Sequence, residues 1–158
     1  MKYTLAILRI LLGWIFFWAF LDKLFGLGLA TAKEQSWLNN ISPTANFLRF
    51  AVSGPFKELF QNLAGLAIVD WLFMLGLLLI GLALILGIAT KIATYSGVLM
   101  LFLMYLATLP LEHNPIIDEH IIYIFTLFVL KSTKAADNFG LGNWWKNTKL
   151  VQKYKFLE

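Results

Sequence analysis

Four long apolar runs alternate with polar segments along the chain. The first extends from about Thr4 to Gly26, the second from Trp71 to Ala89, the third from Ile92 to Leu109 and the fourth from about Ile116 to Leu130. A helix that crosses a membrane needs about 20 predominantly apolar residues. The pattern therefore predicts an all-α membrane protein, a bundle of four transmembrane helices. The fourth is short unless His120 and its neighbours lie at membrane depth.

The segment 27–70 between the first two runs is too long for a simple loop. Ser42 and Pro43 suit the start of a helix. Farther along, apolar residues recur at helical spacing with polar residues on the opposite face, namely Phe56, Leu59, Phe60, Leu63 and Leu66. We expect an amphipathic helix here, which either lies on the outer membrane surface or caps the bundle.

Small residues indicate where the predicted helices approach one another. Ala83 and Gly87 are four positions apart, as are Ala93 and Gly97, and Gly76 falls on the line of the first pair. The turn between the second and third runs, 87–91, is tight. These runs should therefore form an antiparallel hairpin in which the glycines are packing positions.

Composition supports a membrane protein and excludes several kinds of chemistry. The chain is 59% hydrophobic and 14% charged, whereas about a quarter of the residues of a soluble domain are charged. It has no cysteine, which excludes thiol chemistry and cysteine-ligated clusters. Two histidines alone argue against a zinc or haem site, so we expect no metal. Membrane lipids are the expected partners, and nucleic acid is not.

Charge asymmetry predicts the orientation. One side carries Lys2, Lys91, Lys131, Lys134, Lys146, Lys149, Lys153 and Lys155 against Asp137 and Glu158 only. The positive-inside rule then places both termini in the cytoplasm, for a multi-pass protein of the inner (plasma) membrane. Residues 1–142 form the predicted membrane domain. Residues 143–158 form a basic amphipathic tail, whose aromatic residues suggest anchoring at the membrane interface.

The segment 112–123, which overlaps the start of the fourth run, holds the densest group of ionisable residues. It contains the two histidines, His113 and His120, together with Glu112, Asn114, Asp118, Glu119 and Tyr123. Ionisable groups this close to a bilayer are costly, so they are functional candidates, although a hydrated loop would carry them without cost. His120 and Tyr123 share a helical face. Asp118 or Glu119 could orient the imidazole, or His120 could merely cap the helix.

Two basic residues lie in the first run. Lys23 should reach the outer polar layer, and an unpaired buried charge is costly, so we expect it to pair with Asp118 or, as second choice, Asp70. Arg9 lies about 21 Å nearer the inner boundary. It either has a function there or extends to the inner headgroups.

Three groups of residues resemble the DoxX/DoxD family. They are Arg9-x-x-x-Gly13 with Asp22-Lys23, the hairpin sequence from Gly81 to Ala93, and Asn114-Pro115-x-x-Asp118-x-His120-x-x-Tyr123. The resemblance covers nearly the whole chain from Arg9 to Gly142, and the last motif is the most specific. It implies a four-helix membrane bundle. The family takes its name from the membrane subunit of a thiosulfate:quinone oxidoreductase, which oxidises thiosulfate to tetrathionate and reduces quinone.

The residues and the resemblance together suggest a membrane subunit of a quinone-linked redox system. A quinone needs a cleft reachable from lipid, aromatic walls and a group that passes protons. Trp14, Phe17 and Trp18 could supply walls. The predicted catalytic residues are His120, Asp118 and Lys23, and the predicted quinone-binding residues are Arg9, Tyr123, Asn114, Glu112 and Asp70. The outer layer carries more carboxylates than lysines, which does not favour binding of a thiosulfate dianion.

Two other functions fit the sequence. One is a non-catalytic subunit that anchors or assembles a redox partner, which would show an exposed apolar patch on segment 43–67. The other is a small transporter or lipid-handling bundle, in which Lys23 and the carboxylates form a path for an ion or a headgroup. A second redox subunit and a homo-oligomer are compatible with each of these functions.

Overall fold

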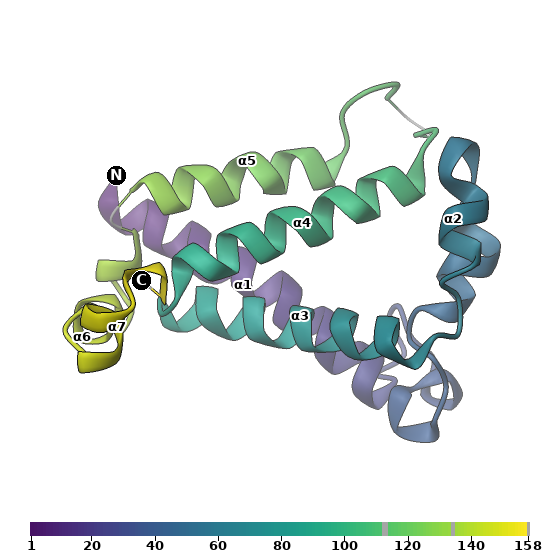
Figure 1. The fold of residues 1–158 in the computed structure, drawn as a ribbon, viewed down its shortest axis with the longest axis horizontal. Helices are drawn as coiled ribbons and strands as arrows, with labels where there is room; N and C mark the ends of the chain where they lie inside the picture. The colour runs from purple at the N-terminus through teal and green to yellow at the C-terminus, as the bar shows by residue number, and fades with distance from the viewer. Residues whose placement is uncertain (112–113, 134, 158) are drawn as a thin grey trace.

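Four helices lie side by side and run most of the length of the molecule (Figure 1). The structure is a computed structural model that describes residues 1–111, 114–133 and 135–157. The helices are α1 (Lys2–Phe25), α3 (Ala67–Leu86), α4 (Thr90–Thr108) and α5 (Glu119–Ser132). Both chain termini lie at one end of this bundle, which we call the termini end. The opposite end, where residues 26–66 and 109–118 connect the helices, is the loop end.

Three of these helices, α1, α3 and α4, are long and apolar enough to cross a membrane. The first three predicted spans are confirmed as helices, with ends displaced by one to four residues. The fourth is shorter than predicted, because α5 begins only at Glu119 and has 14 residues. Its start is delayed because Asp118, in an extended conformation, caps the helix with its side chain. The prediction that the fourth helix begins at Ile116 is therefore wrong, because residues 116–118 precede it.

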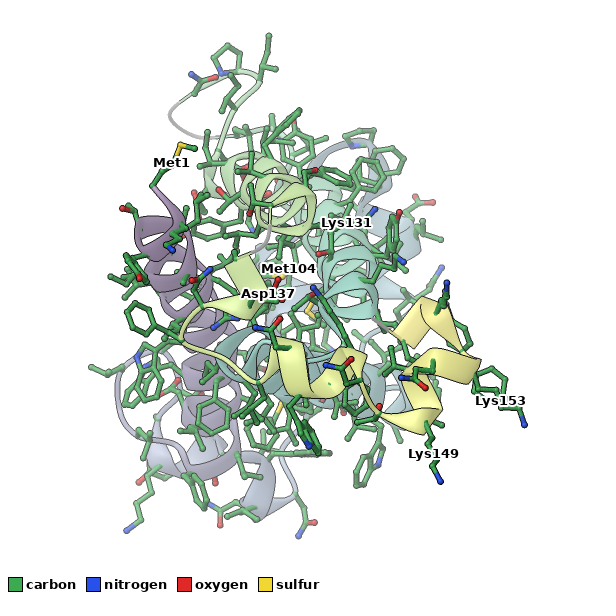
Figure 2. All side chains as sticks on the ribbon, turned by 90° about the vertical axis from the view of Figure 1, so that its left-hand side faces the viewer. Met1, Met104, Lys131, Asp137, Lys149 and Lys153 are labelled. Atoms are coloured by element: carbon green, nitrogen blue, oxygen red, sulfur yellow. The ribbon has the colours of Figure 1, made fainter. Side chains whose placement is uncertain are left out.

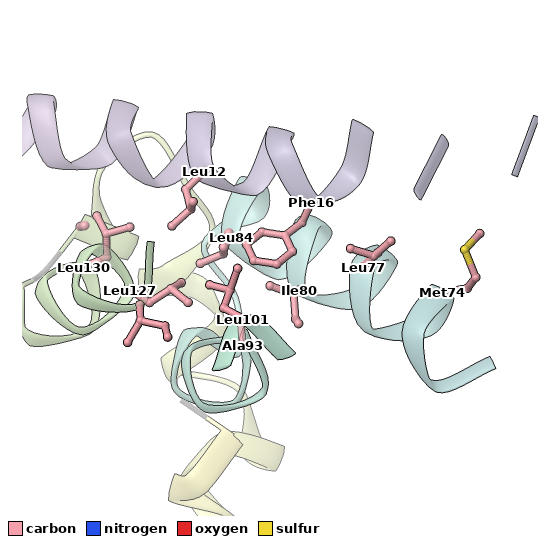
Figure 3. Packing of buried hydrophobic residues seen from close by; sticks show 12 residues of the cluster. Leu12, Phe16, Met74, Leu77, Ile80, Leu84, Ala93, Leu101, Leu127 and Leu130 are labelled. Carbon is pink, nitrogen blue, oxygen red and sulfur yellow. The ribbon is translucent and has the colours of Figure 1, made fainter. Parts of the chain in front are cut away.

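Glycines let α1 and α3 pack backbone against backbone. A Cβ on Gly13 would lie 2.8 Å from the Cβ of Leu84, and one on Gly81 would lie 2.7 Å from the backbone nitrogen of Phe17. Next to this contact, Leu12 and Phe16 point from α1 toward Leu84 and Ile80 of α3 (Figure 3). The core of the bundle continues from there to α4 and α5, through Leu101, Leu127 and Leu130.

The predicted α3–α4 hairpin is confirmed. Gly87 ends α3 with a left-handed φ of 70°, Ala89 also has a positive φ of 47°, and α4 begins at Thr90. The predicted packing glycines do contact neighbouring helices: Gly76 lies against Met100 of α4, and Gly97 lies against Leu127 of α5. Close packing at these positions places α4 between α3 and α5.

The connection between α1 and α3 covers the loop end in short pieces rather than one long helix. It contains η1 (Lys33–Gln35), η2 (Trp37–Asn39), the π-helix η3 (Phe47–Ala51), η4 (Gly54–Phe56) and α2 (Lys57–Gln61). The predicted amphipathic helix over 56–66 is therefore wrong beyond Gln61, where turns lead to Gly65 with a φ of 86°. Phe60, Leu48 and Val52 form a second small core with Ala107 of α4.

The C-terminal segment folds against the termini end. It forms η5 (Ala135–Asp137), α6 (Gly142–Lys146), α7 (Lys149–Lys153) and η6 (Lys155–Leu157). The backbone N–H of Leu141 donates to the carbonyl of Leu86 at 2.7 Å, which ties this segment to the end of α3. Val151 is buried, whereas Trp144 and Phe156 are exposed. The tail thus packs partly on the bundle and keeps aromatic side chains on its surface.

Candidate functional site

Asp118 and His120 form a closely coupled pair at the start of α5. One carboxylate oxygen of Asp118 accepts from the backbone N–H groups of His120 and Ile121, at 3.0 and 3.3 Å. The other lies 2.6 Å from Nδ1 of the His120 ring. The carboxylate therefore caps the helix and fixes the ring, which is 8% exposed. Of the two acids that could orient the imidazole, the structure selects Asp118. In a neutral ring that donates from Nδ1, Nε2 is the acceptor.

The predicted pairing of Lys23 with Asp118 or Asp70 is wrong. Asp118 is engaged with His120, and an oxygen of Asp70 accepts from the hydroxyls of Ser42 and Thr44, at 2.8 and 2.5 Å. Moreover, the first turn of α5 and the last turns of α1 lie on opposite sides of the loop end (Figure 1). Because Ser42 and Thr44 belong to the connecting segment, these bonds fasten that segment to the first turn of α3, where Asp70 lies. Ser42 also accepts from the backbone N–H of Ala45.

Other predicted site residues have structural roles or lie outside the described residues. Asn114 accepts from the backbone N–H groups of Ile116 and Ile117, both at 2.9 Å, which makes a turn before α5. Tyr123 is half-buried on α5 and packs against the core. Glu112, together with His113, lies outside the described residues. Those predicted quinone-binding residues that the structure describes are therefore not gathered around one point.

Arg9 is buried at the termini end, so of its two predicted roles the one in which it extends to the inner headgroups is wrong. Its side chain is 1% exposed, and Nη2 donates to the backbone carbonyl of Phe139 at 2.9 Å and to that of Asn138 at 3.4 Å. Gly87 and Gly140 leave room for the guanidinium, because a Cβ at either position would lie within 3 Å of Nη1. Arg9 therefore joins α1 to the C-terminal segment.

A groove beside α1 contains the residues that best suit ligand binding. Its volume is about 480 Å³, and it is lined by Trp14, Ile15, Trp18, Ala19, Asp22, Lys23, Leu29 and Ala30. Two of the three aromatic residues predicted as quinone walls, Trp14 and Trp18, are here with Lys23, and their rings are 5.8 Å apart. The third, Phe17, packs against Gly81 instead. The groove is thus mostly apolar, with a charged end near the loop end of the bundle.

Asp22 is the site residue that the sequence did not single out. It is 2% exposed, and neither of its carboxylate oxygens has a hydrogen-bond partner among the residues described. Buried carboxylates are normally paired, because an uncompensated charge in an apolar environment is costly. The neighbouring half-buried Lys23 interacts with it electrostatically. Asp22 lines the groove, but its two oxygens are covered, so a ligand's hydrogen-bond donor reaches them only when the neighbouring atoms move aside.

The chain reverses direction directly after the turn of α1 that carries Asp22. Gly26 ends the helix in a left-handed conformation, with its N–H donating to the carbonyl of Asp22 at 2.8 Å. The chain then folds back so that Leu29 and Ala30 line the groove opposite the tryptophans. Gly26 itself has no room for a side chain, since a Cβ would lie 2.6 Å from the Cα of Lys33.

Within the described ranges, no three histidine, aspartate or glutamate side chains come together as a metal site. Three described aspartates near the loop end lie in three separate groups: Asp22 with Lys23, Asp118 with His120, and Asp70 with two hydroxyls. No family model, curated protein or solved structure matches this chain.

Proposed function

We propose that the protein is a membrane subunit of a quinone-linked redox system and that the quinone ring binds in the α1 groove. The observation that carries the proposal is the buried Asp22 carboxylate, without a hydrogen-bond partner in the described chain, beside Lys23 at the end of a tryptophan-walled groove. Trp14 and Ile15 are exposed on the outer surface of α1, so a membrane-soluble ring could enter sideways from lipid.

The two charged groups suit the two oxidation states of a quinone. The ammonium of Lys23 can donate to a quinone carbonyl, and the carboxylate of Asp22 can accept from a quinol hydroxyl. Reduction of a quinone to a quinol takes two electrons and two protons. The chain has no cysteine for a cluster of its own. We therefore assign the electrons to a partner subunit or to a reduced sulfur compound such as thiosulfate, which the resemblance to the DoxX/DoxD family suggests.

The same proposal includes the orientation and the fourth span. The termini end, which carries most of the lysines, faces the cytoplasm by the positive-inside rule. The charged end of the groove then lies toward the outer face of the inner membrane. In this arrangement α5 completes a four-helix bundle, and Asp118 with His120 forms a second polar site near the outer face.

Quinone titration of the purified protein in nanodiscs tests the proposal, with tryptophan fluorescence and extraction of bound quinone as readouts. We expect Lys23→Met and the double variant Trp14→Leu/Trp18→Leu each to weaken binding of a short-chain quinone at least about tenfold, and Asp22→Asn to weaken binding of the corresponding quinol to the same extent. For the two charged residues this is the equivalent of one lost hydrogen bond to a charged group. Lys33→Met and Trp144→Leu are controls, because both residues are exposed and outside the groove.

The variant His120→Ala separates this site from the one predicted at α5. If binding is lost in His120→Ala and retained in Asp22→Asn, the quinone site is at α5 and the groove proposal is wrong. Asp22→Asn should fold normally, and it should be at least as stable as the parent protein, because it removes a buried charge.

A non-catalytic assembly subunit is the second candidate, and one observation favours it. Segment 43–67 carries exposed apolar side chains, among them Phe50 at 82% and Leu59 at 61% exposure. These residues could bind the membrane interface or a partner protein. A photo-crosslinker at Leu59 should then join a redox partner, whereas one at Leu79, which is exposed to a similar extent on α3, should capture lipid only. Capture of lipid at both positions would rule out the assembly function.

A further inference from the structure

Three elements bring lysines to one small pocket at the termini end. The pocket has a volume of about 170 Å³ and is lined by Thr90, Lys91, Lys131, Thr133, Ala136 and Lys146. Lys91 lies in the first turn of α4, Lys131 in the last turn of α5 and Lys146 at the end of α6. Figure 2 looks onto this end of the molecule, with Lys131 and Asp137 toward its middle and Lys149 and Lys153 nearer its edge.

The positive charge around the pocket is only partly neutralised. Lys146 forms an ion pair with Asp137 at 2.8 Å. Lys131 donates to the hydroxyl of Tyr95, and Lys91 donates to the backbone carbonyl of Lys155 at 3.3 Å, so neither hydrogen bond is made to a carboxylate. Within the described part of the chain, neither is paired with a carboxylate. An ammonium has three N–H donors, so each retains donors for a further acceptor.

Like charges held around one cavity repel, and an anion between them removes that repulsion. The volume is nearly six times the ~30 Å³ that a water molecule takes in the liquid, which suits a group of the size of a phosphate. The hydroxyls of Thr90 and Thr133 are in the lining as well. Because α4 begins and α5 ends here, the pocket lies where the headgroups would meet the bundle. Basic pockets between helices at this depth bind anionic headgroups.

We propose that this pocket, which we call the trilysine pocket, binds a phosphate group, with the phosphate of an anionic phospholipid as its ligand. Lys91 and Lys131 are the contacts that carry charge, and Lys146 is held in place by Asp137. The site is at the opposite end of the bundle from the α1 groove and does not depend on the proposed quinone.

Thermal unfolding of the purified chain in nanodiscs tests the proposal. Phosphatidylglycerol mixed into phosphatidylcholine should raise the melting temperature of the parent protein. The increase should be lost in the double variant Lys91→Gln/Lys131→Gln, with lipid affinity roughly thirty-fold lower as expected for two surface lysines. The control Lys149→Gln/Lys153→Gln removes the same charge from exposed positions at the same end and should retain the increase.

Two further measurements distinguish a lipid phosphate from a free phosphate and test whether the variants fold. Inorganic phosphate added to nanodiscs of phosphatidylcholine should raise the melting temperature less than phosphatidylglycerol does. If phosphate and phosphatidylglycerol raise the melting temperature equally when the same fraction of pockets is occupied, the ligand is a soluble anion and the lipid assignment is wrong. Lys91→Arg/Lys131→Arg, which keeps the charge, should keep the lipid effect. Equal losses in the two glutamine double variants, or no lipid effect in the parent, would refute a specific site.

Discussion

At the scale of single residues, Arg9 shows how a charged side chain can be structural inside an apolar helix. Its Nη2 donates to the backbone carbonyls of residues 138 and 139, and Asp137 adds a favourable electrostatic interaction. Its Nε and Nη1 have no hydrogen-bond partner in the described residues. Burial of these groups is costly, so the contact must stabilise the attachment of the C-terminal segment enough to offset it.

We expect Arg9→Met to release the C-terminal segment. Loss of the two hydrogen bonds leaves carbonyls unsatisfied, and the free energy of unfolding should fall by about 1–3 kcal/mol. Limited proteolysis should then cleave faster at Lys149 and Lys153. Arg9→Lys should not restore protection, because one ammonium cannot replace the planar fork of a guanidinium. Lys2→Met is the control, and unchanged cleavage in Arg9→Met would show that Arg9 does not hold the segment.

Residue-level chemistry was only partly predictable from the sequence. Lys23 was predictable as a site residue, but it was expected beside Asp118 or Asp70 and not at the groove of the tryptophans. The short separation of Asp118 and His120 made their contact foreseeable. The burial of Asp22 was not foreseeable, because it depends on the path of residues 27–32 after the helix, which helical periodicity does not describe. The glycines at positions 26 and 28, directly after Asp22-Lys23, were the available signal for a chain reversal there.

At the scale of elements, α1 and α3 approach closely because glycines of α3 carry no side chain. The effect of adding a Cβ to such a glycine depends on whether it would meet the backbone or a flexible side chain of the neighbouring helix. A Cβ on Gly81 would clash with the backbone of Phe17, which cannot move without shifting α1. A Cβ on Gly76 would meet only the end of the flexible Met100 side chain, which a rotamer change can withdraw. Both glycines lie inside α3, so they form a matched pair.

Gly81→Ala should therefore destabilise the protein by about 1–3 kcal/mol, the usual effect of overpacking. Gly76→Ala should be close to neutral, because alanine also improves helix propensity by about 1 kcal/mol over glycine. Thermal unfolding in one detergent compares the two. Equal melting temperatures for the two variants would mean that α1 and α3 are not in close backbone contact.

The elements themselves were predictable where a long apolar run and a tight turn determined them, as in the α3–α4 hairpin. The start of α5 was not, because residues 115–117 are as apolar as a helix but follow the turn made by Asn114. Hydrophobicity alone does not distinguish such an extended stretch from a first helical turn. The predicted helix over 56–66 failed for a related reason: its apolar spacing continues past Gln61, but the backbone turns before Gly65.

At the scale of the whole molecule, the proposed orientation is open to a direct test. The chain has no cysteine, so a single introduced thiol reports one position. Ile116→Cys and Lys149→Cys place it at exposed sites at the loop end and the termini end. In intact cells an impermeant thiol reagent should label position 116 and not position 149. Labelling of 149 alone would invert the topology, and labelling of both would contradict a single orientation.

The shortness of α5 makes bilayer thickness a variable for this protein. Fourteen residues extend about 21 Å, whereas the hydrocarbon core of a bilayer is about 30 Å thick. In the proposed four-span arrangement Ile122, Phe125 and Val129, which are exposed on α5, face lipid, so the bilayer beside α5 must thin locally or the polar residues before it must be drawn inward. We expect higher melting temperatures in short-chain than in long-chain phosphatidylcholine, and no such trend would mean that α5 is shielded from lipid. The hydrophobic mismatch would then bring water and headgroups closest to the bundle at the start of α5, beside the Asp118–His120 pair.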